Sequence, residues 1–96
     1  MLDVVKDKFL HILEVYDSYT EIVDEVDEVI DRANEELQEK YPNYLILRYT
    51  KYIYLTLMDG DLPLSHRLIT YTVLDNLDNP IKLKSTLFYL IEKGLV

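Results

Sequence analysis

The feature that most constrains this chain is its central stretch, residues 44–58, with the sequence YLILRYTKYIYLTLM. Eleven of these fifteen residues are apolar or tyrosine, and the polar ones are Arg48, Thr50, Lys51 and Thr56. A membrane-spanning helix needs about 20 apolar residues, so this stretch is too short to cross a bilayer. The rest of the chain must therefore bury it on nearly every side.

The pattern within this stretch fits two kinds of secondary structure. Its odd positions alternate as a strand would, and tyrosine and isoleucine favour strands. A helix is also consistent with the sequence, with one face formed by Leu45, Tyr49, Tyr52, Ile53 and Thr56. A single hairpin would need partner strands, whereas the length of the stretch and its flanking segments favour a helix. We therefore expect a helix here.

Residues 2–40 carry the strongest periodicity in the sequence. Apolar residues recur at alternating spacings of three and four from Leu2 to Leu37, which is typical of a heptad-patterned helix. Residues 18–21, Ser-Tyr-Thr-Glu, also match a capping box, in which a serine begins a helix. The segment is thus either one long helix or two helices that meet near Ser18.

The apolar seam of this segment is wider than a two-stranded coiled coil requires. Val15, Ile22 and Val29 lie beside it, where such a coiled coil usually carries charges. A stripe of this width predicts several neighbours. We expect a helical bundle or a homodimer, with a protein interface formed by Val15, Tyr19, Ile22, Val26, Val29 and Ile30.

Charge divides the chain into two unequal parts. The net charge is −8; residues 1–40 hold 13 acids and 4 bases, and residues 41–96 hold 5 acids and 6 bases. The acidic part repels phosphate backbones, so a nucleic acid would have to meet the other part.

The sequence lacks the residues that most enzyme mechanisms require. There is no cysteine, and neither His11 nor His66 lies in a metal-binding or catalytic motif. We interpret the acidic residues 24–31 as a solvated helix face. We therefore expect no enzyme, no metal, no cofactor and no membrane contact. The charged N-terminal sequence predicts a cytoplasmic protein, or one in the host cytoplasm if a virus or plasmid encodes it.

Tyrosines gather around the two cations of the central stretch. Aromatic residues beside arginine are typical of protein interfaces and also of base-stacking surfaces. A hydrophobic core with the tyrosine hydroxyls at its rim explains them equally well. The residues concerned are Tyr41, Tyr44, Tyr49, Tyr52 and Tyr54.

Three features organise the C-terminal part. Residues 59–61, Asp-Gly-Asp, predict a turn. A helix is expected over roughly residues 65–77. Asn79 and Pro80 then predict the start of a last helix, which Gly94 ends as a C-cap.

The order of elements over residues 49–96 resembles a winged helix-turn-helix domain without its wing. The segments that carry this resemblance are YTKYIYLTLMDGDLPLS, HRLITYTVLDNL and NPIKLKSTLFYLIEKGLV. The resemblance implies a support helix followed by a recognition helix. It also implies DNA contacts at the start of the recognition helix, made by Lys82, Lys84, Ser85 and Thr86.

We therefore expect a single all-α domain over residues 1–96. An acidic long helix or helical hairpin, residues 1–41, is predicted to pack on a winged-helix-like three-helix unit, residues 43–96. The expected function is that of a small non-enzymatic regulatory or adaptor protein. It would act through contacts with itself, as a homodimer, and with an unidentified protein partner. The alternative is a DNA-binding transcriptional regulator.

Overall fold

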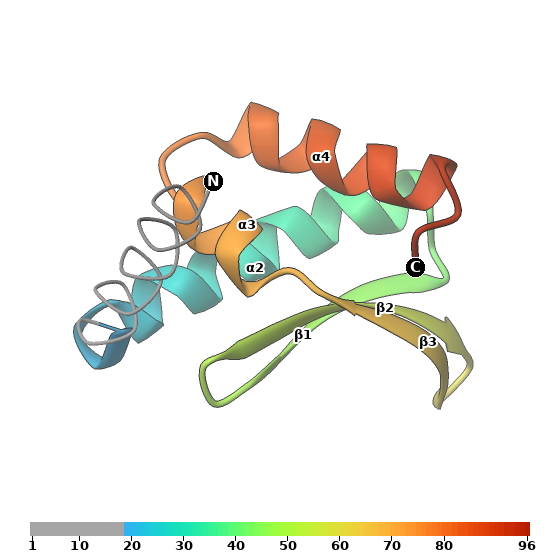
Figure 1. Ribbon diagram of the computed structural model, residues 1–96, viewed down its shortest axis with the longest axis horizontal. Helices are drawn as coiled ribbons and strands as arrows, with labels where there is room; N and C mark the ends of the chain where they lie inside the picture. Colours follow the sequence, from blue (N-terminus) through green and yellow to red (C-terminus); the bar gives the residue numbers. More distant parts are fainter. Residues whose placement is uncertain (1–18) are drawn as a thin grey trace, which may run out of the picture.

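The computed structural model describes residues 19–96, which form an α+β fold (Figure 1). Its elements are α2 (Tyr19–Lys40), β1 (Tyr44–Tyr49), β2 (Tyr52–Asp59), β3 (Leu62–Leu68), α3 (Thr70–Asp75) and α4 (Pro80–Glu92). The strands form one antiparallel sheet in the order β1-β2-β3. The three helices lie on one side of this sheet, so the described part of the chain has two layers (Figure 1).

The prediction of an all-α protein, a helical bundle or coiled coil, is wrong. Residues 44–58 form the hairpin of β1 and β2, in which Ile46 pairs with Leu55. The sequence favours a helix here because the expected elements include no partner strand for a hairpin. Residues 62–68 supply the missing partner as β3, where a loop and the start of a helix were expected. A third strand with one covered face is what makes such a hairpin stable. The C-terminal unit is therefore a sheet followed by two helices, and not a three-helix unit.

Both turns of the sheet use a residue with positive φ. Gly60 has φ +59° in the two-residue loop between β2 and β3, which confirms the turn predicted at residues 59–61. Thr50 has φ +54° in the loop between β1 and β2. Glycine adopts this conformation readily, but a β-branched residue does so at a cost.

The core lies between the helices and the covered face of the sheet. It is built from the buried residues Val26, Ile30, Leu37, Ile46, Ile53, Leu55, Ile69, Val73, Leu83, Leu87 and Leu90. The residues from α2 follow the predicted heptad seam. Burying one such aliphatic side chain fully contributes about 1.5–3 kcal/mol. The seam of α2 thus stabilises the fold of its own chain.

The last helix begins and ends close to where the sequence predicted. The Asn79 side chain accepts a hydrogen bond from the Lys82 backbone N–H at 3.2 Å, and Pro80 is the first helical residue. Gly94, with φ +68°, donates its N–H to the Ile91 carbonyl. Leu95 donates to the Leu90 carbonyl at 2.9 Å, which completes a Schellman motif. The helix expected over residues 65–77 is shorter, because α3 covers only Thr70–Asp75.

One sequence-based question concerns residues outside the described range. α2 begins at Tyr19. Whether residues 2–40 form one helix or two depends on residues 1–18, where Val15 and His11 also lie.

Candidate interaction surface

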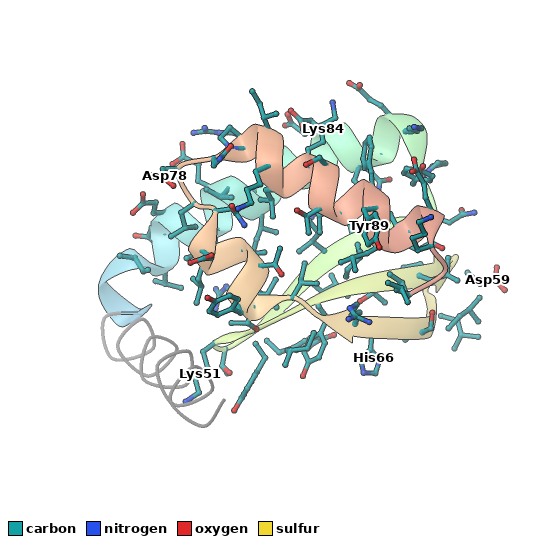
Figure 2. All side chains as sticks on the ribbon, turned by 45° about the horizontal axis from the view of Figure 1, so that its top comes forward. Lys51, Asp59, His66, Asp78, Lys84 and Tyr89 are labelled. Atoms are coloured by element: carbon teal, nitrogen blue, oxygen red, sulfur yellow. The ribbon has the colours of Figure 1, made fainter. Side chains whose placement is uncertain are left out.

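The sheet has one face that no helix within residues 19–96 covers. Side chains alternate along a strand, so the neighbours of the buried Ile53 and Leu55 point away from the helices. Figure 2 shows His66 of β3 on this side, opposite Lys84 of α4. We call this surface the bare face; the strand register assigns to it Leu45, Leu47, Tyr49, Tyr52, Tyr54, Thr56, Met58, Pro63, His66 and Leu68.

Aromatic side chains form an ordered row across the bare face. The rings of Tyr49 and Tyr54 lie 6.3 Å apart between centroids, and those of Tyr54 and His66 lie 5.2 Å apart at 90°. Edge-to-face contacts of this kind hold aromatic rings in place. Tyr49 nevertheless keeps 63 % of its surface exposed. Such rigid, exposed aromatic residues are typical of the anchors in protein interfaces.

A shallow groove of about 390 Å³ runs over the bare face. Thr56 is only 3 % exposed, although no described helix covers it, because its neighbours on the sheet enclose it. The groove is lined by Leu47, Tyr49, Tyr54, Thr56, Met58, Asp61, Pro63 and His66. Its walls are mostly apolar, and Asp61 is its one carboxylate.

Side chains from α2 close the outer edge of β1. Asn34 donates from Nδ2 to the Ile46 carbonyl at 3.0 Å, and its Oδ1 accepts from the Ile46 N–H at 2.8 Å. Gln38 donates from Nε2 to the Tyr44 carbonyl at 2.7 Å. The backbone groups of this edge are therefore satisfied and unavailable to another strand.

The outer edge of β3 has no such cover within the described residues, because β3 is the last strand of the sheet. Its leucines are exposed, Leu64 at 57 % and Leu68 at 53 %. The one charged residue of β3, Arg67, donates to the Leu95 carbonyl at 3.3 Å. A long, apolar and uncovered edge strand is a template for pairing with another chain.

A second hollow of about 390 Å³ lies between α2 and α4. Leu37, Leu83, Leu87 and Phe88 are among its apolar lining residues. Lys84 Nζ lies 4.0 Å from a carboxylate oxygen of Glu36 at its rim. These contacts join the two helices of one chain, so we interpret the hollow as part of the packing interface between α2 and α4.

A hydrogen-bonded acid lies at one end of the interface between α2 and α4. The Tyr41 hydroxyl donates to Glu92 Oε1 at 2.7 Å, and Lys40 Nζ lies 3.5 Å from the same oxygen. The hydrogen bond from Tyr41 lowers the pKa of Glu92, and the same bond raises the pKa of Tyr41. Both side chains border solvent, and their contact joins α2 to α4.

Four of the six residues predicted to form a protein interface lie in or against the core of the chain itself. Val26 and Ile30 are buried in the core, and Ile22 and Val29 are partly buried against it. Tyr19 is the first residue of α2, and Val15 lies outside the described residues. The described part of the seam is thus largely occupied within one chain.

The residues predicted to contact DNA all lie on α4. Lys82, Lys84 and Ser85 are exposed, whereas Thr86 is half-buried. The hydroxyls of Ser85 and Thr86 donate to the Lys82 carbonyl at 3.0 and 2.8 Å. The carboxylate of Glu36 lies beside Lys84, and α2 carries nine acids and two bases. The cations of α4 therefore lie next to an acidic surface.

Arg48, which the sequence placed among the tyrosines, binds the acidic helix. Its Nε donates to Asp27 Oδ1, and its Nη2 donates to Asp27 Oδ2 at 2.8 Å. This bidentate pair ties β1 to α2.

Sequence reasoning missed the β3 edge altogether. It assigned His66 to the first turn of a helix, whereas His66 lies in an extended strand. The signal that could have found β3 is the alternation of Leu62, Leu64, His66 and Leu68 directly after an Asp-Gly turn.

Residues 19–96 contain neither a cluster of metal ligands nor a membrane-spanning helix. No three histidines, cysteines or acids in this range gather in a way that could hold a metal ion. No helix in it is long and apolar enough to cross a membrane. Compared with known proteins, the chain matches no family model, no curated protein and no solved structure.

Proposed function

We propose that this protein is a small, non-enzymatic regulatory or adaptor protein that acts through protein–protein contacts, as a homodimer. The observation that carries the proposal is the bare face, with its row of Tyr49, Tyr54 and His66 above an apolar groove. Contiguous apolar patches on a protein surface commonly mark interaction sites.

The distribution of charge supports this assignment. Eight of the ten residues of the bare face are apolar or tyrosine, and none is a lysine, arginine, aspartate or glutamate. The acids are concentrated on α2, in the helix layer on the other side of the sheet. An interface core depleted of charge and enriched in tyrosine is the usual composition of a protein-binding surface. We also propose a cytoplasmic location, because a chain without cysteine suits a reducing compartment.

Site-specific photocrosslinking in cells tests the function. A photoreactive phenylalanine replaces Tyr49 on the bare face or, as the matched control, Tyr89 on α4, which is 55 % exposed. We expect defined protein adducts from position 49 and few from position 89. The partner protein identified in the adducts is then purified by itself. Its binding to the parent chain and to a Tyr54→Ala variant is measured by titration.

The expected result is binding by the parent and weaker binding by the Tyr54→Ala variant, with binding by a Tyr89→Ala variant unchanged. Equal adducts at both positions, or binding that Tyr54→Ala does not weaken, would contradict the proposal.

A further inference from the structure

The backbone of β3 offers a limited set of hydrogen-bonding groups to a partner. Ile69 donates its N–H to the Ile53 carbonyl at 2.8 Å, and Arg67 pairs with Leu55 in the same register. Because backbone groups alternate between the two sides of a strand, those of His66 and Leu68 point away from β2. Pro63 has no N–H, and the register shift between the Met58–Pro63 and Leu57–Ser65 pairs leaves Leu64 as the extra residue of a bulge. The available edge is therefore residues 64–68.

The sequence of this edge is close to symmetric about its centre. Leucines stand two residues before and two residues after His66, at positions 64 and 68, and both are more than half exposed. A twofold axis at His66 would bring Leu64 of each copy against Leu68 of the other. Such self-complementarity is what an isologous interface requires.

Charge selects this register over its neighbour. With the axis at His66, Arg67 lies opposite Ser65 of the second copy. With the axis at Arg67, the two arginines would lie directly opposite each other, which is destabilising. Both histidine side chains of the favoured register lie on the bare face, next to the Tyr54 rings at 5.2 Å.

The acidic helix supports the same arrangement. α2 is hydrogen-bonded to the outer edge of β1, at the opposite side of the sheet from the open edge of β3. Two copies joined through β3 therefore keep their acidic helices at the two far ends. A contact made by the charged face of α2 would instead bring those acids together.

We infer that β3 pairs antiparallel with β3 of a second copy of this chain, with the twofold axis at His66. This inference rests on the proposed function, because it identifies the contact that makes the adaptor a homodimer. The two three-stranded sheets become one sheet of six strands. Their bare faces then form one continuous surface with two grooves, which a larger or twofold-symmetric partner could bind.

Sedimentation velocity of the full chain provides the first test. The parent should sediment as a dimer of the 11.4 kDa chain at high micromolar concentration. Leu68→Lys should shift it to a monomer, because a lysine on an edge strand opposes pairing. The matched control is Ile81→Lys in the first turn of α4, at a residue that is 82 % exposed; it should remain dimeric. Circular dichroism verifies that each variant is folded.

Disulfide trapping provides the second test, and the absence of native cysteines makes it clean. In the favoured register the two Cα atoms of residue 66 lie about 5.5 Å apart, which is within the range of about 4.4–6.8 Å for a disulfide. His66→Cys should therefore crosslink rapidly on mild oxidation. Leu68→Cys is the matched control on the same edge. Its two copies would be four residues out of register, about 14 Å apart, and should crosslink slowly.

The results separate this inference from the proposed function. A dimer that Leu68→Lys leaves intact overturns pairing through β3 alone. A parent that stays monomeric overturns pairing through β3 and also the homodimeric state named in the proposed function. Crosslinking by His66→Cys that is no faster than by Leu68→Cys overturns the register. Either result leaves the photocrosslinking test of the bare face standing, since that test concerns a different protein.

Discussion

Asn34 of α2 binds both backbone groups of Ile46, with distances of 3.0 Å to its carbonyl and 2.8 Å from its N–H. The side-chain amide of Asn34 thus takes the place that another strand would occupy. One edge of the sheet is closed in this way by the chain's own helix, while the other edge, β3, stays open within residues 19–96. The sheet can therefore accept a further strand beside β3 but not beside β1.

Replacing Asn34 with alanine should destabilise the fold. The partly buried N–H and carbonyl of Ile46 would lose their partner, and leaving such groups unsatisfied costs about 1–3 kcal/mol. Gln38→Ala is the control, because it removes a single exposed hydrogen bond and should cost about 0.5–1.5 kcal/mol. Urea unfolding measures both. If Asn34→Ala lowers the free energy of unfolding no more than Gln38→Ala does, the contact of Asn34 with Ile46 does not stabilise the fold as described.

Alanine substitutions in β2 should cost more stability at a fully buried position than at a half-buried one. Ile53 is fully buried, and Ile53→Ala should cost about 2–5 kcal/mol. Leu57 points to the same side but is half-buried near the end of the strand, so Leu57→Ala should cost less. Thermal and chemical unfolding provide the comparison. Equal losses at both positions would contradict the description of the core.

The contact between Tyr41 and Glu92 predicts a pH dependence of stability. The pKa of Glu92 is lowered in the folded state, first by the hydrogen bond from Tyr41. Its contribution is therefore fully present above the unfolded pKa of about 4.3 and is lost as the pH falls through the lower folded value. The pKa of Tyr41 is raised, so its contribution is present below about pH 10 and is lost as the pH rises further.

Tyr41→Phe tests this linkage, because it removes the hydroxyl and keeps the ring. Melting temperatures measured from neutral to acidic pH should fall less steeply for the variant than for the parent. Tyr89→Phe, at an exposed tyrosine of α4, is the control and should follow the parent curve. Parallel curves for the parent and Tyr41→Phe would contradict the assigned contact.

The DNA-binding alternative makes a separate prediction. Phosphate contacts supply much of the affinity of such proteins and are strongest at low salt. Because Glu36 lies beside Lys84 and α2 is acidic, we expect no binding to random duplex DNA even at low ionic strength. A gel shift of the parent that the double substitution Lys82→Glu, Lys84→Glu abolishes would establish DNA binding through α4.

The sequence predicted the local features whose signals are short-range. Asn79, Pro80 and Gly94 bound the last helix as expected, because capping depends on a few adjacent residues. The heptad seam correctly placed Val26, Ile30 and Leu37 on one face of a helix. Gly60 correctly marked a turn.

The class of the fold depended on long-range pairing and was mispredicted. Whether residues 44–58 form a helix or a hairpin depends on whether another segment completes a sheet. That segment, β3, contains Pro63 and no β-branched residue, so its intrinsic strand propensity is weak, and its pairing with β2 outweighs that weakness. Without β3 in the prediction, neither the bare face nor the open edge could be recognised. For the tyrosines of that surface, the sequence indicated only that they gather around the two cations of the central stretch.

The most direct measurement of the central claim is the change in backbone amide chemical shifts on dilution of isotope-labelled protein. The claim is that the chain makes its protein contacts through β3 and the bare face. Diluting from millimolar to low micromolar concentration should move the resonances of His66, Leu68 and their neighbours on β2, while those in the middle of α4 stay fixed. Shifts confined to α2 or α4, or no shifts at all over this range, would contradict the account.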